Sequence, residues 1–176
     1  MINKLVVVAL GDRNAGKSTT WHSLFNLFIN EDDRRPVKTG KEERRLYLSK
    51  TEYIYVYLIN GSPQERKTPV SKIIQGKTPN IVCCSIQYVE DAKETIDYFI
   101  EHEYCFFVHW LNPGFHQTTR VEDVFGLKSY ILKDNRSQFF IKNGKQEDLE
   151  HRTTEINNFL YKWANGQKFL YFLGDK

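Results

Sequence analysis

The sequence predicts an α/β fold in three layers, with a mainly parallel sheet, one antiparallel strand and helices on both faces. Residues 5–10 form an apolar run without alternation, which is typical of a strand buried on both faces of a parallel sheet. Helical stripes then alternate with further apolar runs along the chain. At 176 residues, 40% of them hydrophobic, the chain is long enough for a single packed domain over residues 1–176.

The first half of the chain predicts a helix and a pair of strands after the first strand. Apolar residues spaced i, i+3, i+4 and i+7 indicate a helix that begins near residue 18. The charged segment 31–45 contains a proline and a glycine, so we expect an exposed loop. Two strands joined by a tight connection follow at 46–49 and 53–59. The stripe of the predicted helix consists of Trp21, Leu24, Phe25 and Phe28.

The second half continues the alternation of strands and helices. The segment 72–80 ends a short helix or turn before an apolar strand at 81–88. The remaining predicted elements are a helix within 90–104, a strand at 105–114 ending in a Pro-Gly turn, a late strand within 137–145 and a long helix at 149–163. In such parallel sheets ligands bind at the carboxyl ends of the strands, so the residues that follow each strand are the candidates for a site.

Composition narrows the classes of function. The net charge is only +3, and basic residues are interleaved with acids, so a nucleic-acid surface is disfavoured. Cys83, Cys84 and Cys105 lie in apolar segments without metal-ligand spacing, and we expect them to be buried and reduced. No run of 18 apolar residues predicts a membrane span, and no signal peptide precedes the first strand. A cytoplasmic protein is the resulting expectation.

The segment after the first strand matches a phosphate-binding loop. Residues 11–18 spell GDRNAGKS, which fits the pattern G-x-x-x-x-G-K-[ST]. The apolar strand before it and the amphipathic helix after it are the structural context that the pattern requires. The sequence therefore predicts that the chain binds a nucleotide.

Each fixed position of this pattern has a chemical role. Glycines let successive backbone N–H groups converge on the phosphates. The Lys17 ammonium can reach the β- and γ-phosphate oxygens, the Ser18 hydroxyl is a ligand for Mg²⁺, and the positive end of the helix faces the anion. The expected contacts of the nucleotide are Gly11, Asp12, Arg13, Asn14, Ala15, Gly16, Lys17, Ser18 and Thr19.

The loop resembles that of translation-factor-related GTPases, a branch of the P-loop NTPases that carries G-x-x-N-x-G-K-[ST] with an Asn where Asn14 stands. The order of elements is also similar over most of the chain. The resemblance implies a three-layer P-loop NTPase fold, a Mg²⁺ cofactor and hydrolysis of a triphosphate, with Lys17 as a catalytic residue. It also implies that a threonine of the exposed loop, Thr39, is a second Mg²⁺ ligand.

Two other motifs of these GTPases are altered in this chain. At the place of D-x-x-G, Asn60 lacks the charge that holds the metal, and Pro63 has no N–H to offer a phosphate. Gln64 falls where the glutamine that positions the attacking water would stand, so it is the second expected catalytic residue. At the place of the base-recognition motif N-K-x-D only Asn112 is retained. Asn112 is the expected contact of the base, although its segment also fits a plain turn, and the choice between ATP and GTP stays open.

Three functions remain open. The first is a Mg²⁺-dependent NTPase or nucleotide switch, in which the segment 31–45 meets a protein partner and one of Arg34, Arg35, Arg44 and Arg45 acts on the phosphates. The second is a kinase for a nucleotide or another small molecule, in which Arg120, Arg136 and Arg152 form a lid. The third is a nucleotide-binding subunit without turnover. We expect the first.

Overall fold

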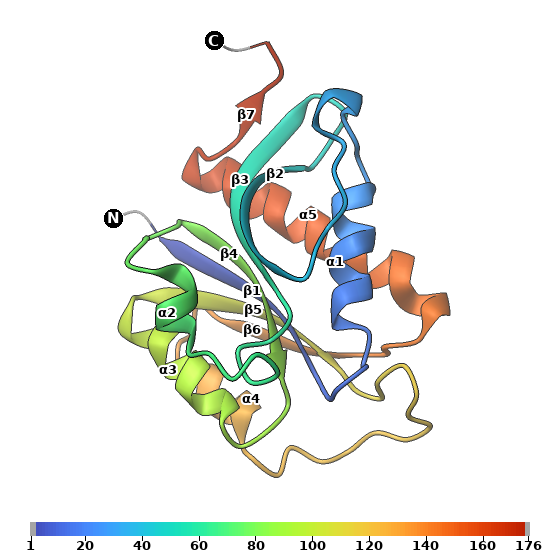
Figure 1. Cartoon of the computed structure of the whole chain (residues 1–176), viewed down its shortest axis with the longest axis vertical. Coiled ribbons are helices and arrows are strands. Elements are labelled where there is room, and N and C mark those ends of the chain that lie inside the picture. Colours follow the sequence, from blue (N-terminus) through green and yellow to red (C-terminus); the bar gives the residue numbers. More distant parts are fainter. Residues whose placement is uncertain (1–2, 175–176) are drawn as a thin grey trace.

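A seven-stranded sheet forms the middle layer of the computed structural model, which describes residues 3–174 (Figure 1). The strands are β1 (Lys4–Gly11), β2 (Gly40–Tyr47), β3 (Glu52–Asn60), β4 (Ile81–Gln87), β5 (Tyr104–Leu111), β6 (Gln138–Lys142) and β7 (Tyr171–Phe172). The helices are α1 (Lys17–Asn26), α2 (Val70–Ile74), α3 (Ala92–Glu101), α4 (Leu127–Ile131) and α5 (Leu149–Gln167). Two short 3₁₀ turns, η1 (Glu31–Asp33) and η2 (Gln146–Asp148), complete the chain.

The strands follow the order β2-β3-β4-β1-β5-β6, with β7 beside β3. Strands β3, β4, β1, β5 and β6 run parallel, whereas β2 is antiparallel to β3. This arrangement confirms the predicted α/β class and is consistent with the three-layer P-loop NTPase fold. Because β1 lies between β4 and β5, its carboxyl end opens at the centre of the sheet edge where ligands bind.

The central strand β1 is buried on both faces, as its unbroken apolar run predicts. Leu5, Val7 and Ala9 pack beneath α1 and α5, and the residues between them pack beneath α2, α3 and α4. Figure 1 shows these two groups of helices on opposite sides of the sheet. Burying one side chain of this size stabilises the fold by roughly 1.5–3 kcal/mol, so β1 is a rigid base for the loop that follows it.

Strand β2 is longer than its sequence predicts. The segment 31–45 was expected to be a loop, but β2 already begins at Gly40, and Arg44 and Arg45 pair with Val56 and Tyr55 of β3. The physical reason is its place at the edge of the sheet, where charged residues suit a strand that has only one neighbour. The exposed loop before β2 therefore ends at Thr39.

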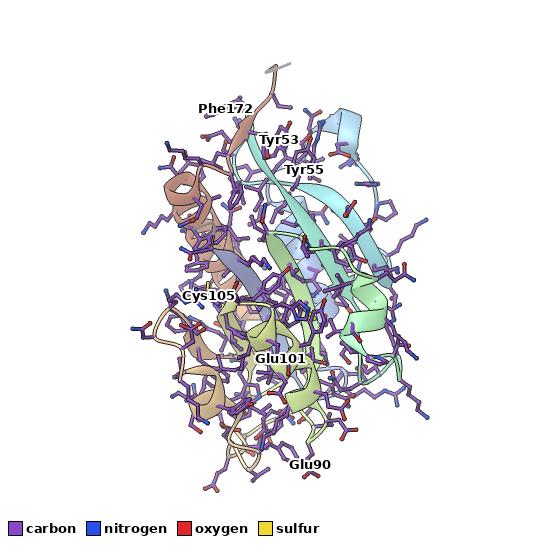
Figure 2. The ribbon with its side chains drawn as sticks, turned by 90° about the vertical axis from the view of Figure 1, so that its left-hand side faces the viewer. Tyr53, Tyr55, Glu90, Glu101, Cys105 and Phe172 are labelled. Carbon is purple, nitrogen blue, oxygen red and sulfur yellow. The ribbon has the colours of Figure 1, made fainter. Side chains whose placement is uncertain are left out.

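Short elements also occur where the sequence predicts none. Helix α4 packs Leu127 and Ile131 against α3 and the sheet. Strand β7 is antiparallel to the start of β3, where the ring of Tyr171 stacks on that of Tyr53 at 5.6 Å. Figure 2 shows Tyr53, Tyr55 and Phe172 together at this end of the molecule.

Two predictions from composition, on the cysteines and on membrane-spanning helices, can be compared with the described residues. The three cysteines are buried and free, and burial raises the pKa of the Cys83 thiol to about 12. Between residues 3 and 174, no helix has both the length and the apolar character needed to cross a bilayer.

Candidate functional site

The loop 11–18 leaves the carboxyl end of β1 and turns directly into α1. Gly16 has φ +103°, a conformation that a side chain would strain, and Asn14 has φ +61°, which asparagine tolerates. No side chain caps the start of α1, so its first N–H groups stay available to an anion. Ser18 and Thr19 are exposed in this first turn.

Two neighbouring loops pack closely on the loop 11–18. A Cβ on Gly114 would come within 2.9 Å of the Ala15 Cβ, and a Cβ on Gly144 would come within 2.5 Å of the Ala15 carbonyl oxygen. A Cβ on Gly11 would likewise lie 2.7 Å from the Ala15 Cβ. The backbone N–H of Phe115 donates to the Ala15 carbonyl at 3.1 Å. These glycines allow the loops after β5 and β6 to hold the loop 11–18 in shape.

Lys17 is buried and is turned toward its own loop. Its ammonium donates to the carbonyl oxygens of Gly11, at 3.1 Å, and Asp12, at 2.6 Å. It also pairs with the Glu65 carboxylate at 3.7 Å. Burial lowers the pKa of Lys17, and the charges of Glu65 and Asp12 oppose this shift. The lysine is therefore a positive charge beside the helix start, with Glu65 as its counterion.

Ser18 is joined to the end of β3 by Asn60. The Ser18 hydroxyl donates to Asn60 Oδ1 at 2.9 Å, and the same amide donates from Nδ2 to the Lys38 carbonyl at 3.1 Å. The next residue, Gly61, has φ +90°, and a Cβ there would meet Thr39 Cγ2 at 3.0 Å. Asn60 thus ties α1, β3 and the loop before β2 together.

This cluster fits a magnesium ion held largely by phosphate oxygens. The donors are hydroxyl and amide oxygens, the hard ligands that Mg²⁺ takes in proteins. Ser18 and Asn60 are joined by a hydrogen bond, and the methyl group of Thr39 lies beside Gly61, the residue after Asn60. Within residues 3–174 no group of three or more histidine, cysteine, aspartate or glutamate side chains is arranged to hold a metal.

Glu65 is a residue of the site that our sequence analysis did not predict. Its backbone N–H donates to the Ser62 hydroxyl at 3.2 Å, and its carboxylate accepts from the Ser62 N–H at 3.2 Å. This reciprocal pair is a capping box, and it orients the carboxylate toward Lys17. The spacing Ser-x-x-Glu was a local signal for this turn, but nothing in it identifies Lys17 as the partner.

The Gln64 side chain points toward α3 in this structure. Its amide donates to Thr95 Oγ1 of α3 at 2.9 Å and accepts from the backbone N–H of Gln87 at 3.2 Å. Both ends of the amide are therefore bound on the α3 side of the turn. A role on the attacking water would require Gln64 to leave these two contacts.

Asn112 has a role within its own loop. Its side chain donates to the Val121 carbonyl and accepts from the Val121 N–H, both at 2.8 Å. Asn112 is almost fully buried, and this geometry favours the turn interpretation over contact with a base. Gln117 of the same loop donates to the Asp12 carboxylate, whereas Arg13 is exposed.

Of the arginines considered for a lid, Arg152 lies beside Gly16 of the loop, whereas Arg136 lies near the amino ends of the strands. Arg152 of α5 is buried behind this loop and donates to Thr20 Oγ1 at 3.3 Å and to the Lys145 carbonyl at 2.8 Å. Burial lowers the pKa of Arg152 to about 10. Arg136 pairs with Asp134 next to residues at the amino ends of the strands.

The arginines near β2 also have structural contacts. Arg44 stacks on the Phe25 ring at 4.5 Å and pairs with Glu42. Arg45 lies over the Tyr53 ring at 4.7 Å. These contacts favour structural roles for both arginines.

Comparison with known proteins adds little to this geometry. No family model matches the chain, and no curated protein matches it. Among solved structures it is similar to the structure of Methanosarcina barkeri Roco2 RocCORdC bound to GDP, with 17% sequence identity and a TM-score of 0.47. The match covers 97% of this chain and 53% of that one, so the chain spans about half of the solved protein. The function proposed below rests on the residues of this chain.

Proposed function

We propose that the chain binds a nucleoside triphosphate in the loop 11–18 and acts as a nucleotide switch or a Mg²⁺-dependent NTPase. The observation that carries this proposal is the convergence of Lys17 and the uncapped start of α1 on one glycine-bounded loop. Backbone N–H groups and a lysine charge in this arrangement are what a polyphosphate requires. We propose Gly11–Thr19 as its contacts and the cytoplasm as its location.

Binding exchanges the partner of Lys17. Glu65 balances the lysine charge at 3.7 Å. A phosphate oxygen carries more negative charge and accepts a short, charge-assisted hydrogen bond, so it displaces Glu65 from the ammonium. The turn at 62–69 then loses a contact with the loop. This turn is the element whose position depends on the nucleotide.

The loop before β2 is a second responsive element. Asn60 holds the Lys38 carbonyl and the Ser18 hydroxyl at the same time. Ser18, Asn60 and Thr39 would hold Mg²⁺, which supplies positive charge to the phosphates when it is bound. Rearrangement at Ser18 is therefore transmitted to the exposed loop through one amide. We propose that a protein partner binds this loop, within the segment 31–45.

A nucleotide-binding subunit without turnover is the second candidate. Two observations favour it: Asn60 carries no charge for a metal, and Gln64 is bound to Thr95 and Gln87. In that case the bound nucleotide stabilises the conformation of the loop 11–18, and the diphosphate and the triphosphate bind equally well.

Calorimetric titration with ATP, ADP, GTP and GDP, each with and without Mg²⁺, separates these functions. A switch or NTPase predicts that one triphosphate binds more tightly than its diphosphate and that Mg²⁺ strengthens the difference. Equal binding of the di- and triphosphate, indifferent to Mg²⁺, would establish the second candidate.

The same titration on Lys17→Ala tests the site itself. We expect triphosphate affinity to fall by at least ~100-fold, because a buried charge-assisted contact is lost, while thermal unfolding stays cooperative. Lys93→Ala, an exposed lysine of α3, is the control. Wild-type affinity in Lys17→Ala would refute nucleotide binding at this loop.

A further inference from the structure

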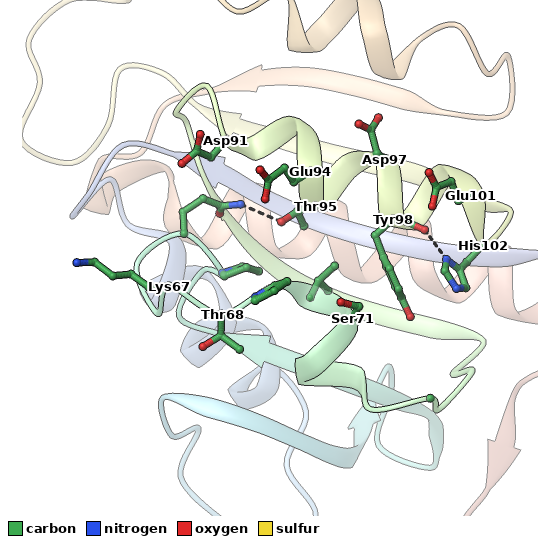
Figure 3. Close-up of a pocket in the computed structure, with 15 residues that line it drawn as sticks. Lys67, Thr68, Ser71, Asp91, Glu94, Thr95, Asp97, Tyr98, Glu101 and His102 are labelled. Atoms are coloured by element: carbon green, nitrogen blue, oxygen red, sulfur yellow. Dashed lines mark hydrogen bonds between the residues drawn. The ribbon is translucent and has the colours of Figure 1, made fainter.

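A groove of about 800 Å³ lies between the turn that follows β3 and helix α3 (Figure 3), and Lys17 does not line it. One wall comes from Pro63, Gln64 and residues 67–71, which include the start of α2. The other wall comes from α3 and the residues at its two ends, from Asp91 to His102. This volume is within the range of natural ligand sites, and the mechanism proposed above does not use it.

The α3 wall of the groove is acidic. Asp91, Glu94, Asp97 and Glu101, here called the acidic wall, are spaced by three or four residues and all line the groove. At about 1.5 Å per residue they extend over roughly 15 Å. Three of them are exposed, and Asp97 accepts a hydrogen bond from the Tyr130 hydroxyl. Lys67 is the lysine on the facing wall, so negative charge predominates.

The floor of the groove is suited to long aliphatic side chains. The side chain of Tyr98, half-buried, points from α3 toward Ser71 of α2 and stacks on the His102 ring at 4.0 Å (Figure 3). Pro69 and the buried Val70 lie across from it. Lysine and arginine combine an apolar stem with a charged head, and their heads also bind aromatic faces. The acidic wall and the floor of the groove therefore both favour a basic side chain.

We propose that this groove binds a basic helical segment of a protein partner and that docking there is coupled to the nucleotide. A helix with lysines or arginines at spacings of three and four residues presents a row of cations with the same period as the acidic wall. Several cations in one row use the full length of the wall, which a single small cation does not. The partner is thus defined by the charge and spacing of one helix face.

The coupling follows from two consecutive residues, and this half of the inference rests on the proposed function. Gln64 lines the groove and is bound to Thr95 of α3, and Glu65 pairs with Lys17. When phosphate displaces Glu65, the turn that forms one wall of the groove loses its contact with the loop. Occupancy of either site therefore changes affinity at the other by the same factor.

Docking is tested with the nucleotide-free chain and an alanine helix that carries lysines at these spacings. Binding is followed by fluorescence anisotropy at low and high salt. We expect Glu94→Gln/Glu101→Gln to weaken binding by about five-fold or more, since two exposed ion pairs are lost. The control Glu147→Gln/Glu150→Gln removes two exposed glutamates near the start of α5 and should bind as the wild type does.

Three results would overturn docking of a basic helix in the groove. They are equal binding by both double variants, equal binding of a peptide with the same lysines in scrambled order, and equally tight binding of spermine. The last result would assign the groove to small polyamines. Circular dichroism of each variant establishes that its fold is intact.

Coupling is tested by repeating the titration with the triphosphate that binds the wild type. We expect the peptide affinity to change by about three-fold or more, and Glu65→Gln, which removes the charge that pairs with Lys17, to abolish this change without abolishing docking. Docking without coupling would overturn the coupling alone. Failure of the chain to bind any nucleotide would refute the proposed function, and the docking result would stand by itself.

Discussion

The hydroxyl of Ser18 donates a hydrogen bond of 2.9 Å to the amide oxygen of Asn60, 42 residues further along the chain. Ser18 lies in the first turn of α1, and Asn60 ends β3, so this bond joins the loop 11–18 to the strand two places away in the sheet. An asparagine here offers an oxygen without a charge. The site is therefore less negative around a metal ion than it would be with a carboxylate.

Asn60→Asp should make triphosphate binding more dependent on Mg²⁺. A carboxylate beside Ser18 attracts the cation, so we expect affinity with Mg²⁺ to rise by roughly ten-fold. In EDTA the same carboxylate repels the phosphates, and affinity should fall. The substitution also loses the donor to the Lys38 carbonyl, which costs about 1 kcal/mol of stability.

Titration calorimetry in Mg²⁺ and in EDTA measures both effects of Asn60→Asp. The control is Asn80→Asp, an exposed asparagine just before β4 at the opposite edge of the sheet. An unchanged response to Mg²⁺ would mean that Asn60 does not face the metal.

Glu65→Gln should tighten triphosphate binding. Glu65 pairs with the Lys17 ammonium and would compete with a phosphate for it, and glutamine keeps the shape while removing that charge. Since the Glu65 side chain is 31% exposed, solvent screens the pair, and we expect a gain of only about two- to five-fold. The gain should shrink at high salt.

Glu122→Gln, at an exposed glutamate of another loop, is the control for the Glu65 measurement. Weaker triphosphate binding in Glu65→Gln would mean that Glu65 helps to bind the nucleotide and does not compete with it.

Local patterns predicted the core of this molecule, and long-range contacts explain what they missed. The apolar run at 5–10 and the loop 11–18 are local features, and both lie where the sequence predicts. The start of β2 was missed because its charged residues are stabilised by pairing with β3, which no local pattern reveals. The direction of Gln64 and the pairing of Glu65 with Lys17 depend on how the turn packs between α1 and α3.

His109 should make the protein less stable in acid. It lies fully buried in β5, and burial, aided by the positive charge of Lys142, lowers its pKa from 6.5 to about 3, while the Glu155 carboxylate, 3.6 Å from its Nε2, opposes this shift. The unfolded chain takes up a proton below pH 6.5, and the folded chain does not until about pH 3. Stability is therefore lost as the pH falls through this interval, by up to about 1.4 kcal/mol per pH unit.

Urea unfolding from pH 7 to pH 4 tests the contribution of His109. His109→Leu should have a flatter pH dependence than the wild type, and His22→Gln, at an exposed histidine, should retain the wild-type slope. A slope unchanged in His109→Leu would assign the acid sensitivity to other groups.

Gln64→Ala decides whether the chain hydrolyses its triphosphate in the way that the sequence predicts. If the amide positions the attacking water, turnover should fall by at least ~10-fold while triphosphate affinity stays within about two-fold.

Thr95→Val is the informative comparison because it removes the contact that holds Gln64 on α3. If Gln64 is released toward the loop, the Thr95→Val protein should hydrolyse the triphosphate at least as fast as the wild type. The measurement is the rate of phosphate release under saturating triphosphate for the wild type, Gln64→Ala and Thr95→Val. Equal rates for Gln64→Ala and the wild type would exclude the residue from the reaction and leave it as the link between the turn and α3.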